Sequence, residues 1–160
     1  IETWIPQAAD NATYVASVAQ GLNAARERWP GLAHIAYGDL FLEDIRAWRQ
    51  ALCASLGFTP LFPLFGSDTA ALAHTMQQGG LHAQLCCVDT TQLDASFAGR
   101  AFDTSLLRDL PQHIDPCGEN GEFHTCVFAG PMFNHPIAIE CGDSVLRDGR
   151  FAYTDFKLPA

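Results

Sequence analysis

The stretch HIAYGDLFLEDIRAWRQALCASLG, residues 34–57, decides the fold class of this sequence. Its first residues are mostly apolar and run into Gly38, which predicts a short strand ending at a turn. From Glu43 onward apolar residues recur at helical spacing, and Gly57 supplies a helix end. A strand followed directly by an amphipathic helix is the repeating unit of a parallel sheet covered by helices.

The same alternation continues on both sides of this stretch. A helix is predicted over residues 11–29, an apolar extended segment over 61–65, a helix capped by Ser67, and a buried strand over 81–88. Later in the chain the pattern changes to short strands, predicted at residues 123–128, 136–141, 144–147 and 151–156. We therefore expect an α/β fold, a parallel sheet flanked by helices with an antiparallel C-terminal extension.

Composition narrows the class of protein. The chain has 160 residues, 48% of them hydrophobic, which suits one domain with a packed core. Its 18 acidic and 9 basic residues give a net charge of −9 with no basic run, which excludes a general binder of nucleic acid or anionic membranes. The absence of an export signal and the six cysteines without a C-x-x-C pair predict reduced thiols and a cytoplasmic location.

The densest group of polar residues is DPCGENGEFHT, residues 115–125. Gly118 and Gly121 mark a turn-rich loop whose backbone can approach a ligand closely. The strand that follows places Glu122 and His124 on one face, where a carboxylate and an imidazole suit acid–base work or a metal. The alternative is a solvated loop that enters a strand with one polar side. Because the spacing of a metal site is absent, we predict no bound metal.

A second group lies where the strand of residues 34–37 ends and a helix begins. Ligands of open α/β sheets gather at the carboxyl ends of strands. Gly38 would let the backbone approach a ligand, and Asp39 suits a hydroxyl or amine donor. Glu43 and Arg46 share one side of the helix, where Arg46 suits a carboxylate or phosphate. The alternative is helix capping with a surface ion pair.

These segments resemble the ATP-binding family that contains diphthine–ammonia ligase, a family similar to the N-type ATP pyrophosphatases, or PP-loop enzymes. The resemblance extends over nearly the whole chain. It rests on GDLFLEDIRAWR, TPLFPLF, LDASFAGRAFD, DPCGENGEFHT and VFAGPMFNHPI, which begin at residues 38, 59, 93, 115 and 127.

The resemblance implies an adenine nucleotide alpha hydrolase-like fold and an amide-forming reaction. A substrate carboxylate is adenylated with ATP and magnesium, and ammonia then displaces AMP. The expected partners are a small-molecule or protein carboxylate substrate and ammonia. The residues implied as catalytic are Glu119, Glu122 and His124. The residues implied as substrate-binding are Gly38, Asp39, Glu43, Arg46, Gly118, Gly121 and Thr125.

Two departures from the family pattern shape these expectations. The phosphate-binding S-G-G-x-D-S loop is absent from the sequence, so we expect residues 1–90 to be the remainder of the nucleotide-binding domain and residues 91–160 its substrate-facing segment, in one compact unit. We expect no adenylation by this chain alone, and self-association through an exposed sheet edge as a homo-oligomer. Phe123 and His124 replace the tyrosine and glutamate of the ligases proper, a form associated with a bacterial-type branch.

Two other functions stay open at this point. One is a non-catalytic ligand-binding domain that has lost the ATP loop. The other is a metal-dependent hydrolase that uses Cys117, His124 and the loop glutamates.

Overall fold

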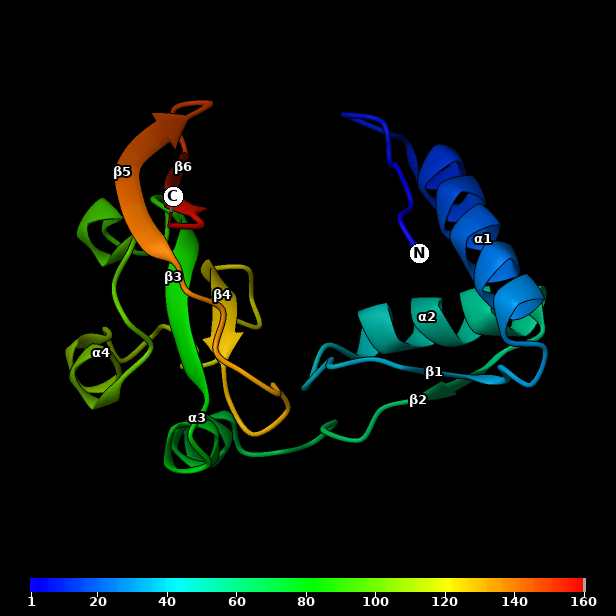
Figure 1. Ribbon diagram of the computed structural model, residues 1–160, viewed down its shortest axis with the longest axis horizontal. Helices are drawn as coiled ribbons and strands as arrows, with labels where there is room; N and C mark the ends of the chain where they lie inside the picture. The colour runs from blue at the N-terminus through cyan, green and yellow to red at the C-terminus, as the bar shows by residue number, and fades with distance from the viewer. Residues whose placement is uncertain (160) are drawn as a thin grey trace. The chain divides into compact units, whose positions relative to one another are not determined.

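Two parts of the chain each form their own compact unit, residues 1–65 and residues 66 onward. The computed structural model describes residues 1–159 (Figure 1). It is a mixed α/β structure with a small parallel sheet and a larger antiparallel one, so the predicted fold class is confirmed. The division that the sequence suggests after residue 90, into a nucleotide-binding and a substrate-facing part, concerns function and stays a prediction.

The first unit pairs two helices with two short parallel strands. In chain order these elements are α1 (Asn11–Arg28), β1 (His34–Ala36), α2 (Glu43–Leu56) and β2 (Thr59–Leu61). Asp10 caps α1 by accepting a hydrogen bond from the Thr13 N–H at 2.8 Å. Gly57 ends α2 with a φ of 70°, the left-handed conformation that glycine adopts without strain.

Arg26 connects the two helices of the first unit. Its guanidinium lies 4.0 Å from the centre of the Phe58 ring. It donates to the carbonyl oxygens of Leu56 and Gly57 at 3.0 and 3.2 Å. These carbonyls belong to the end of α2, where a cation is favoured by the helix dipole. One arginine therefore both packs on an apolar ring and satisfies a helix end.

The second unit is a four-stranded antiparallel sheet with short helices. Its helices are α3 (Thr69–Gln78), the 3-10 helix η1 (Ala95–Phe97) and α4 (Thr104–Asp109). Its strands, in the spatial order β4-β3-β6-β5, are β4 (Phe123–Ala129), β3 (His82–Asp89), β6 (Phe151–Lys157) and β5 (Glu140–Arg147). Neighbouring strands in this order all run antiparallel.

Strand β3 differs from the expectation. The alternation of strands and helices grouped it with the parallel sheet, but it pairs antiparallel with β4 on one side and β6 on the other. Within residues 1–159, parallel pairing occurs between β1 and β2 alone. The sequence did not settle this point, since a central strand buried on both faces reads as the same apolar run in either kind of sheet.

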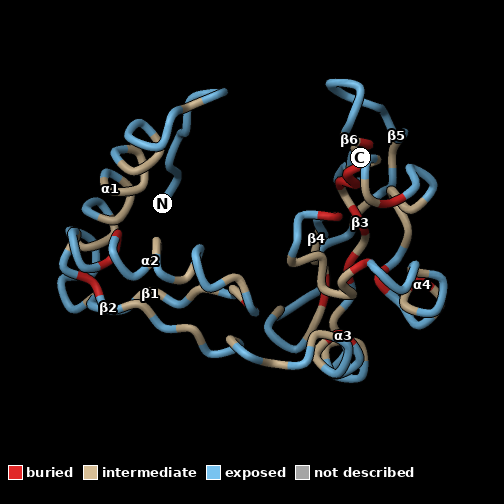
Figure 2. The backbone as a smooth tube through the Cα atoms, turned by 180° about the vertical axis from the view of Figure 1, so that it is seen from behind, coloured by how far each residue is buried: buried red, intermediate tan, exposed pale blue. Residues whose placement is uncertain are grey.

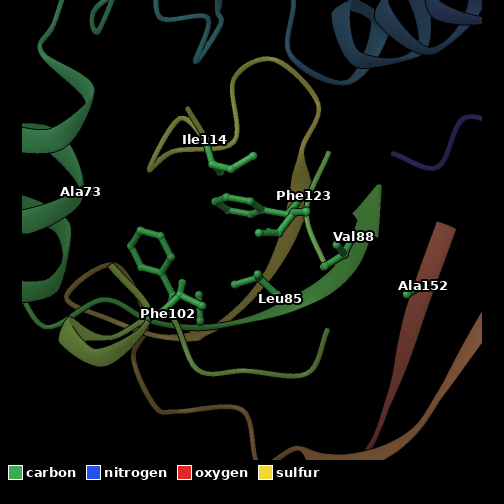
Figure 3. Packing of buried hydrophobic residues seen from close by; sticks show 10 residues of the cluster. Ala73, Leu85, Val88, Phe102, Ile114, Phe123 and Ala152 are labelled. Carbon is green, nitrogen blue, oxygen red and sulfur yellow. The ribbon is translucent and has the colours of Figure 1, made fainter. Parts of the chain in front are cut away.

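The core of the second unit gathers on β3. Leu85, Val88 and Leu106 are fully buried. Phe102 and Phe123 belong to the same cluster as Leu85 and Val88 (Figure 3). Buried positions accordingly follow the length of β3 (Figure 2). On the side of β3 away from β4, two different segments form hydrogen bonds. Residues 99–102 bond to the first half of β3, and β6 pairs with its last three residues.

The remaining differences are local. Asp68, not Ser67, caps α3 by accepting from the Ala71 N–H at 2.7 Å. Residues 136–139 form no strand, and residues 140–147 make one strand with an irregularity between Cys141 and Ser144. The Asp148-Gly149 hairpin turn is confirmed, with φ values of 54° and 62°, as expected for the turn type that matches strand twist.

Candidate functional site

The loop of residues 115–122 is built around a buried carboxylate. Glu122 is 1% exposed. One of its oxygens accepts from the Asp115 N–H at 3.0 Å and from the Asn120 side-chain amide at 3.1 Å, and the other accepts from the Asn120 N–H at 2.9 Å. Both oxygens of Glu122 are therefore occupied by the loop that leads into β4. Hydrogen bonds to a charged acceptor are the stronger kind.

Two further features fix the shape of this loop. The Asp115 carboxylate accepts from the N–H groups of Cys117 and Glu119 at 2.9 and 3.3 Å. Gly118 has a φ of 71°, and a Cβ there would lie 2.7 Å from the Phe123 carbonyl oxygen. Only glycine fits that position without displacing the strand. Gly121, with a φ of 81°, completes the turn. The predicted need for glycines in this loop is met by its geometry.

Strand β4 separates the predicted residues that follow the loop. His124 lies opposite Cys87 of β3 and is exposed, whereas Thr125 lies opposite Leu85. Because side chains alternate along a strand, His124 and Thr125 point to opposite faces of the sheet. Thr125 shares its face with Phe123, which packs in the core. The imidazole and the threonine hydroxyl therefore serve different sides of the second unit.

Cys117 stands where the loop meets α3. Its thiol donates to the Thr69 carbonyl oxygen at 3.3 Å. Burial, together with the negative charges of Asp115 and Glu119, raises the pKa of the Cys117 thiol to about 11. The thiol is thus protonated at neutral pH and is a poor nucleophile. This argues against the hydrolase that would use Cys117.

The group predicted in the first unit forms ion pairs around α2. Asp39 accepts from Arg49 at 2.8 Å, and Glu43 lies 3.9 Å from Arg46. The Arg46 guanidinium lies 4.3 Å from the centre of the Phe65 ring, and its Nε is buried without a hydrogen-bond partner in the described structure. Arg46 is therefore held by aromatic packing more than by its ion pair.

Gly38 and Arg49 alter the prediction for that group. Gly38 has ordinary backbone geometry, and a Cβ there would meet nothing within 4 Å, so glycine is not required at this position. Arg49, which the sequence reasoning missed, holds Asp39 and lies 4.4 Å from the Tyr37 ring centre. The available signal was its position three residues after Arg46, on the same side of the helix.

A second buried carboxylate, Asp89 at the end of β3, was also missed. Its two oxygens accept from Arg150, one from Nε at 3.0 Å. Thr91 donates to it from both its N–H and its hydroxyl, at 3.0 and 2.7 Å. The hydrogen bonds from Arg150, and then those from Thr91, hold the Asp89 pKa well below its usual range. The signal was a carboxylate directly after the most apolar strand.

Among residues 1–159, no three or more His, Cys, Asp or Glu side chains come together as a metal site would need. Over the same residues, every helix is too short or too polar to span a bilayer.

The sequence of this chain is similar to those of known proteins. The sequence pattern of the diphthamide synthase C-terminal domain matches residues 68–153, which lie in the second unit. A zebrafish (Danio rerio) protein named diphthine–ammonia ligase is 30% identical over 76% of this chain and 50% of its own length. A protein of the same name from Schizosaccharomyces pombe is 28% identical over 69% of this chain and 19% of its own length. The chain thus spans half or less of these relatives.

Proposed function

Since the chain belongs to the family of the diphthamide synthase C-terminal domain, we propose that it is the substrate-facing part of an ATP-dependent ligase that forms an amide from a carboxylate and ammonia. The observation that carries the proposal is the loop of residues 115–122. Its backbone is fixed by the buried Glu122 and by Gly118, and it carries a further carboxylate, Glu119. A rigid loop is what a reaction needs to hold a small nucleophile in place.

The chemistry assigns one task to each loop residue. ATP activates the substrate carboxylate when the whole protein acts. Ammonium must then lose a proton before its nitrogen can attack the acyl carbon, and a carboxylate or an imidazole can accept that proton. Glu119 holds the ammonium and accepts the proton, and the exposed His124 is the second acceptor. Glu122, whose oxygens are occupied by the loop, positions Glu119 and does not itself meet the substrate.

The group in the first unit is proposed as a binding site for an anionic group. Arg46, with an Nε that has no hydrogen-bond partner within residues 1–159 and its guanidinium against Phe65, supplies the cation of that site. Gly38 and Asp39 precede α2, and Glu43 is its first residue. Asp39 is already paired with Arg49, so it orients that arginine as well as offering an acceptor of its own.

Residues 1–159 of this chain do not form a binding site for ATP phosphates or for magnesium. The sequence contains no S-G-G-x-D-S or other glycine-rich phosphate loop. The described residues hold no metal-type cluster of acidic or imidazole side chains. We therefore assign no residue of this chain to the phosphates or to magnesium.

The experiment uses the protein that contains this chain. Amide formation and AMP release are measured with ammonium for the parent, Glu119→Gln and the exposed control Glu140→Gln. Loss of a positioned base lowers rates by about 10²–10⁴-fold. We expect Glu119→Gln to lower amide formation at least tenfold and Glu140→Gln to leave it unchanged. Equal rates for all three would refute the role of Glu119, and binding without AMP release would favour the non-catalytic alternative.

A further inference from the structure

Strand β5 forms one edge of the antiparallel sheet in the second unit. It pairs with β6 on one side, and among residues 1–159 no segment pairs with its other side. Apart from Gly142, every residue of β5 is exposed. Its large apolar side chains Val145 and Leu146 are 47% and 58% exposed. A strand edge of this kind presents backbone N–H and C=O groups to which another strand can pair.

The side chains of β5 are divided between the two faces of the sheet. The pairing of β5 with β6 is regular over residues 144–147, directly after an irregularity that ends at Asp143. The chain is in strand conformation through both parts. Because side chains alternate along a strand, Asp143, Val145 and Arg147 share one face and Leu146 lies on the other. Since a bulge interrupts regular pairing, an added strand would pair with residues 143–147.

The charges of this segment are arranged symmetrically about Val145. Asp143 lies two residues before it and Arg147 two residues after it. Both charged side chains are exposed, and neither forms an ion pair within residues 1–159. The Arg147 guanidinium lies 5.1 Å from the centre of the Tyr153 ring of β6. The segment is therefore complementary in charge to a second copy of itself that runs in the opposite direction.

Few registers allow two copies of this segment to pair about a two-fold axis. Opposite residues must lie on the same face, so they are an even number of positions apart. With Val145 opposite Val145 of the second copy, Asp143 lies opposite Arg147 at both ends, and the two Leu146 side chains are diagonal neighbours on the other face. A shift of two residues either way places Arg147 opposite Val145 or Cys141 and removes both ion pairs. The net charge of −9 opposes association in general, so the register with both ion pairs is favoured.

We propose that two copies of this chain associate through β5 in this register, so that their two antiparallel sheets become one continuous sheet. The second copy is the partner because the segment is complementary to itself in direction, charge and face. Five residues from each copy make a small interface, which is typical of weak, reversible association. The proposed reaction does not depend on this contact, and the contact does not depend on the reaction.

Exchanging the charges at Asp143 and Arg147 tests both the surface and the register. The 160-residue chain is studied by sedimentation velocity from micromolar to millimolar concentration, where the parent should shift reversibly from monomer to dimer. Asp143→Arg and Arg147→Asp each place like charges opposite each other, so each variant alone should dimerise about tenfold more weakly. An equimolar mixture of the two variants should dimerise like the parent, because unlike charges then lie opposite each other again. The variant that carries both substitutions should do the same.

Two lysine substitutions of equal charge complete the test. Val145→Lys places two ammonium groups at the centre of the contact and should abolish dimerisation. Met132→Lys adds the same charge at a residue that is 66% exposed and lies outside β5, so it should leave dimerisation unchanged. The amide NMR spectrum reports whether each variant folds, and the lysine pair stands as a test if a charge-exchange variant does not.

Three results would overturn the inference. The first is a parent chain that stays monomeric at millimolar concentration. The second is a dimer that Val145→Lys forms as well as Met132→Lys does, because such a dimer would use another surface. The third is a mixture of folded Asp143→Arg and Arg147→Asp that dimerises no better than either variant alone, because residues 143 and 147 would then not lie opposite each other.

Discussion

The two units of this protein differ in how they bury their apolar residues. In the second unit, ten buried side chains form one cluster around β3. In the first unit the buried apolar residues are Leu40, Leu52, Cys53 and Phe58, and α1 buries none along its 18 residues. The second unit is stabilised by a hydrophobic core. The first unit is stabilised more by contacts between aromatic rings and by the Arg26 guanidinium that packs on the Phe58 ring.

The candidate site residues follow the same division. In the second unit, Glu122 and Asp89 are buried carboxylates whose partners fix the loop and the end of β3. In the first unit, Glu43 and Arg46 form a looser pair, with side chains 76% and 36% exposed. The second unit therefore holds its carboxylates in a fixed geometry, whereas the Glu43–Arg46 pair of the first unit is free to change its geometry.

The largest effect should come from separating the units. Residues 66–160 expressed alone should unfold cooperatively on heating and give dispersed amide NMR signals, because the core lies within them. Residues 1–65 alone should give neither, since a two-stranded sheet and a helix without buried residues provide little burial. Cooperative unfolding of residues 1–65 would contradict the comparison.

Removing one carboxylate charge from each unit should destabilise the two units to different extents. Glu122→Gln keeps the shape but replaces an oxygen that accepts from the loop with an amide donor, so it should lower the free energy of unfolding by about 1.5–3 kcal/mol. Glu43→Gln removes one partner of an exposed pair and should cost less than about 1 kcal/mol. Urea unfolding of both variants checks the difference. Equal losses would mean that Glu122 does not hold the loop.

Two glycines give a smaller contrast. Gly118→Ala forces a Cβ onto a left-handed residue and within 2.7 Å of the Phe123 carbonyl oxygen, so it should cost about 1–3 kcal/mol. Gly38→Ala meets nothing within 4 Å and has ordinary backbone geometry, so its effect should stay within about 0.5 kcal/mol. The midpoints of thermal unfolding report both. A stable Gly118→Ala variant would show that the loop can relax.

The smallest expected effect is on how stability depends on pH in the acid range. Arg150 lowers the Asp89 pKa in the folded state, so this pair stabilises the fold fully above the unfolded aspartate pKa of about 3.9. The stabilisation is lost as the pH falls from there toward the folded pKa. Asp89→Asn and Arg150→Gln should each flatten the acid-side decline in stability, measured between pH 5 and 3 at about 25 °C. An unchanged slope in both variants would exclude this pair as its source.

Local sequence signals predicted much of the fold. The helix end at Gly57 was predictable because the left-handed conformation depends on the residue type at that position. The Asp148-Gly149 turn was predictable for the same reason. Tertiary pairing was not accessible in the same way. The direction of β3 depends on partners 35 or more residues further along the chain.

The candidate site shows the same limit. Gly118 and Gly121 were predicted from their residue type, and both adopt the expected conformation. The burial of Glu122 was not predicted, since strand alternation placed it on the polar face with His124. Its hydrogen bonds to the loop, which arise only when the turn closes, draw it inward instead.

The transfer of labelled ammonia to a carboxylate can be measured directly. The protein that contains this chain is incubated with ATP, magnesium, ¹⁵N-ammonium and a panel of carboxylates, and the products are analysed by mass spectrometry. We expect a carboxylate whose amide carries ¹⁵N, formed with one AMP per amide and at least tenfold more slowly when Glu119 is replaced by glutamine. ADP in place of AMP, or an amide that forms equally well with Glu119→Gln, would contradict this expectation.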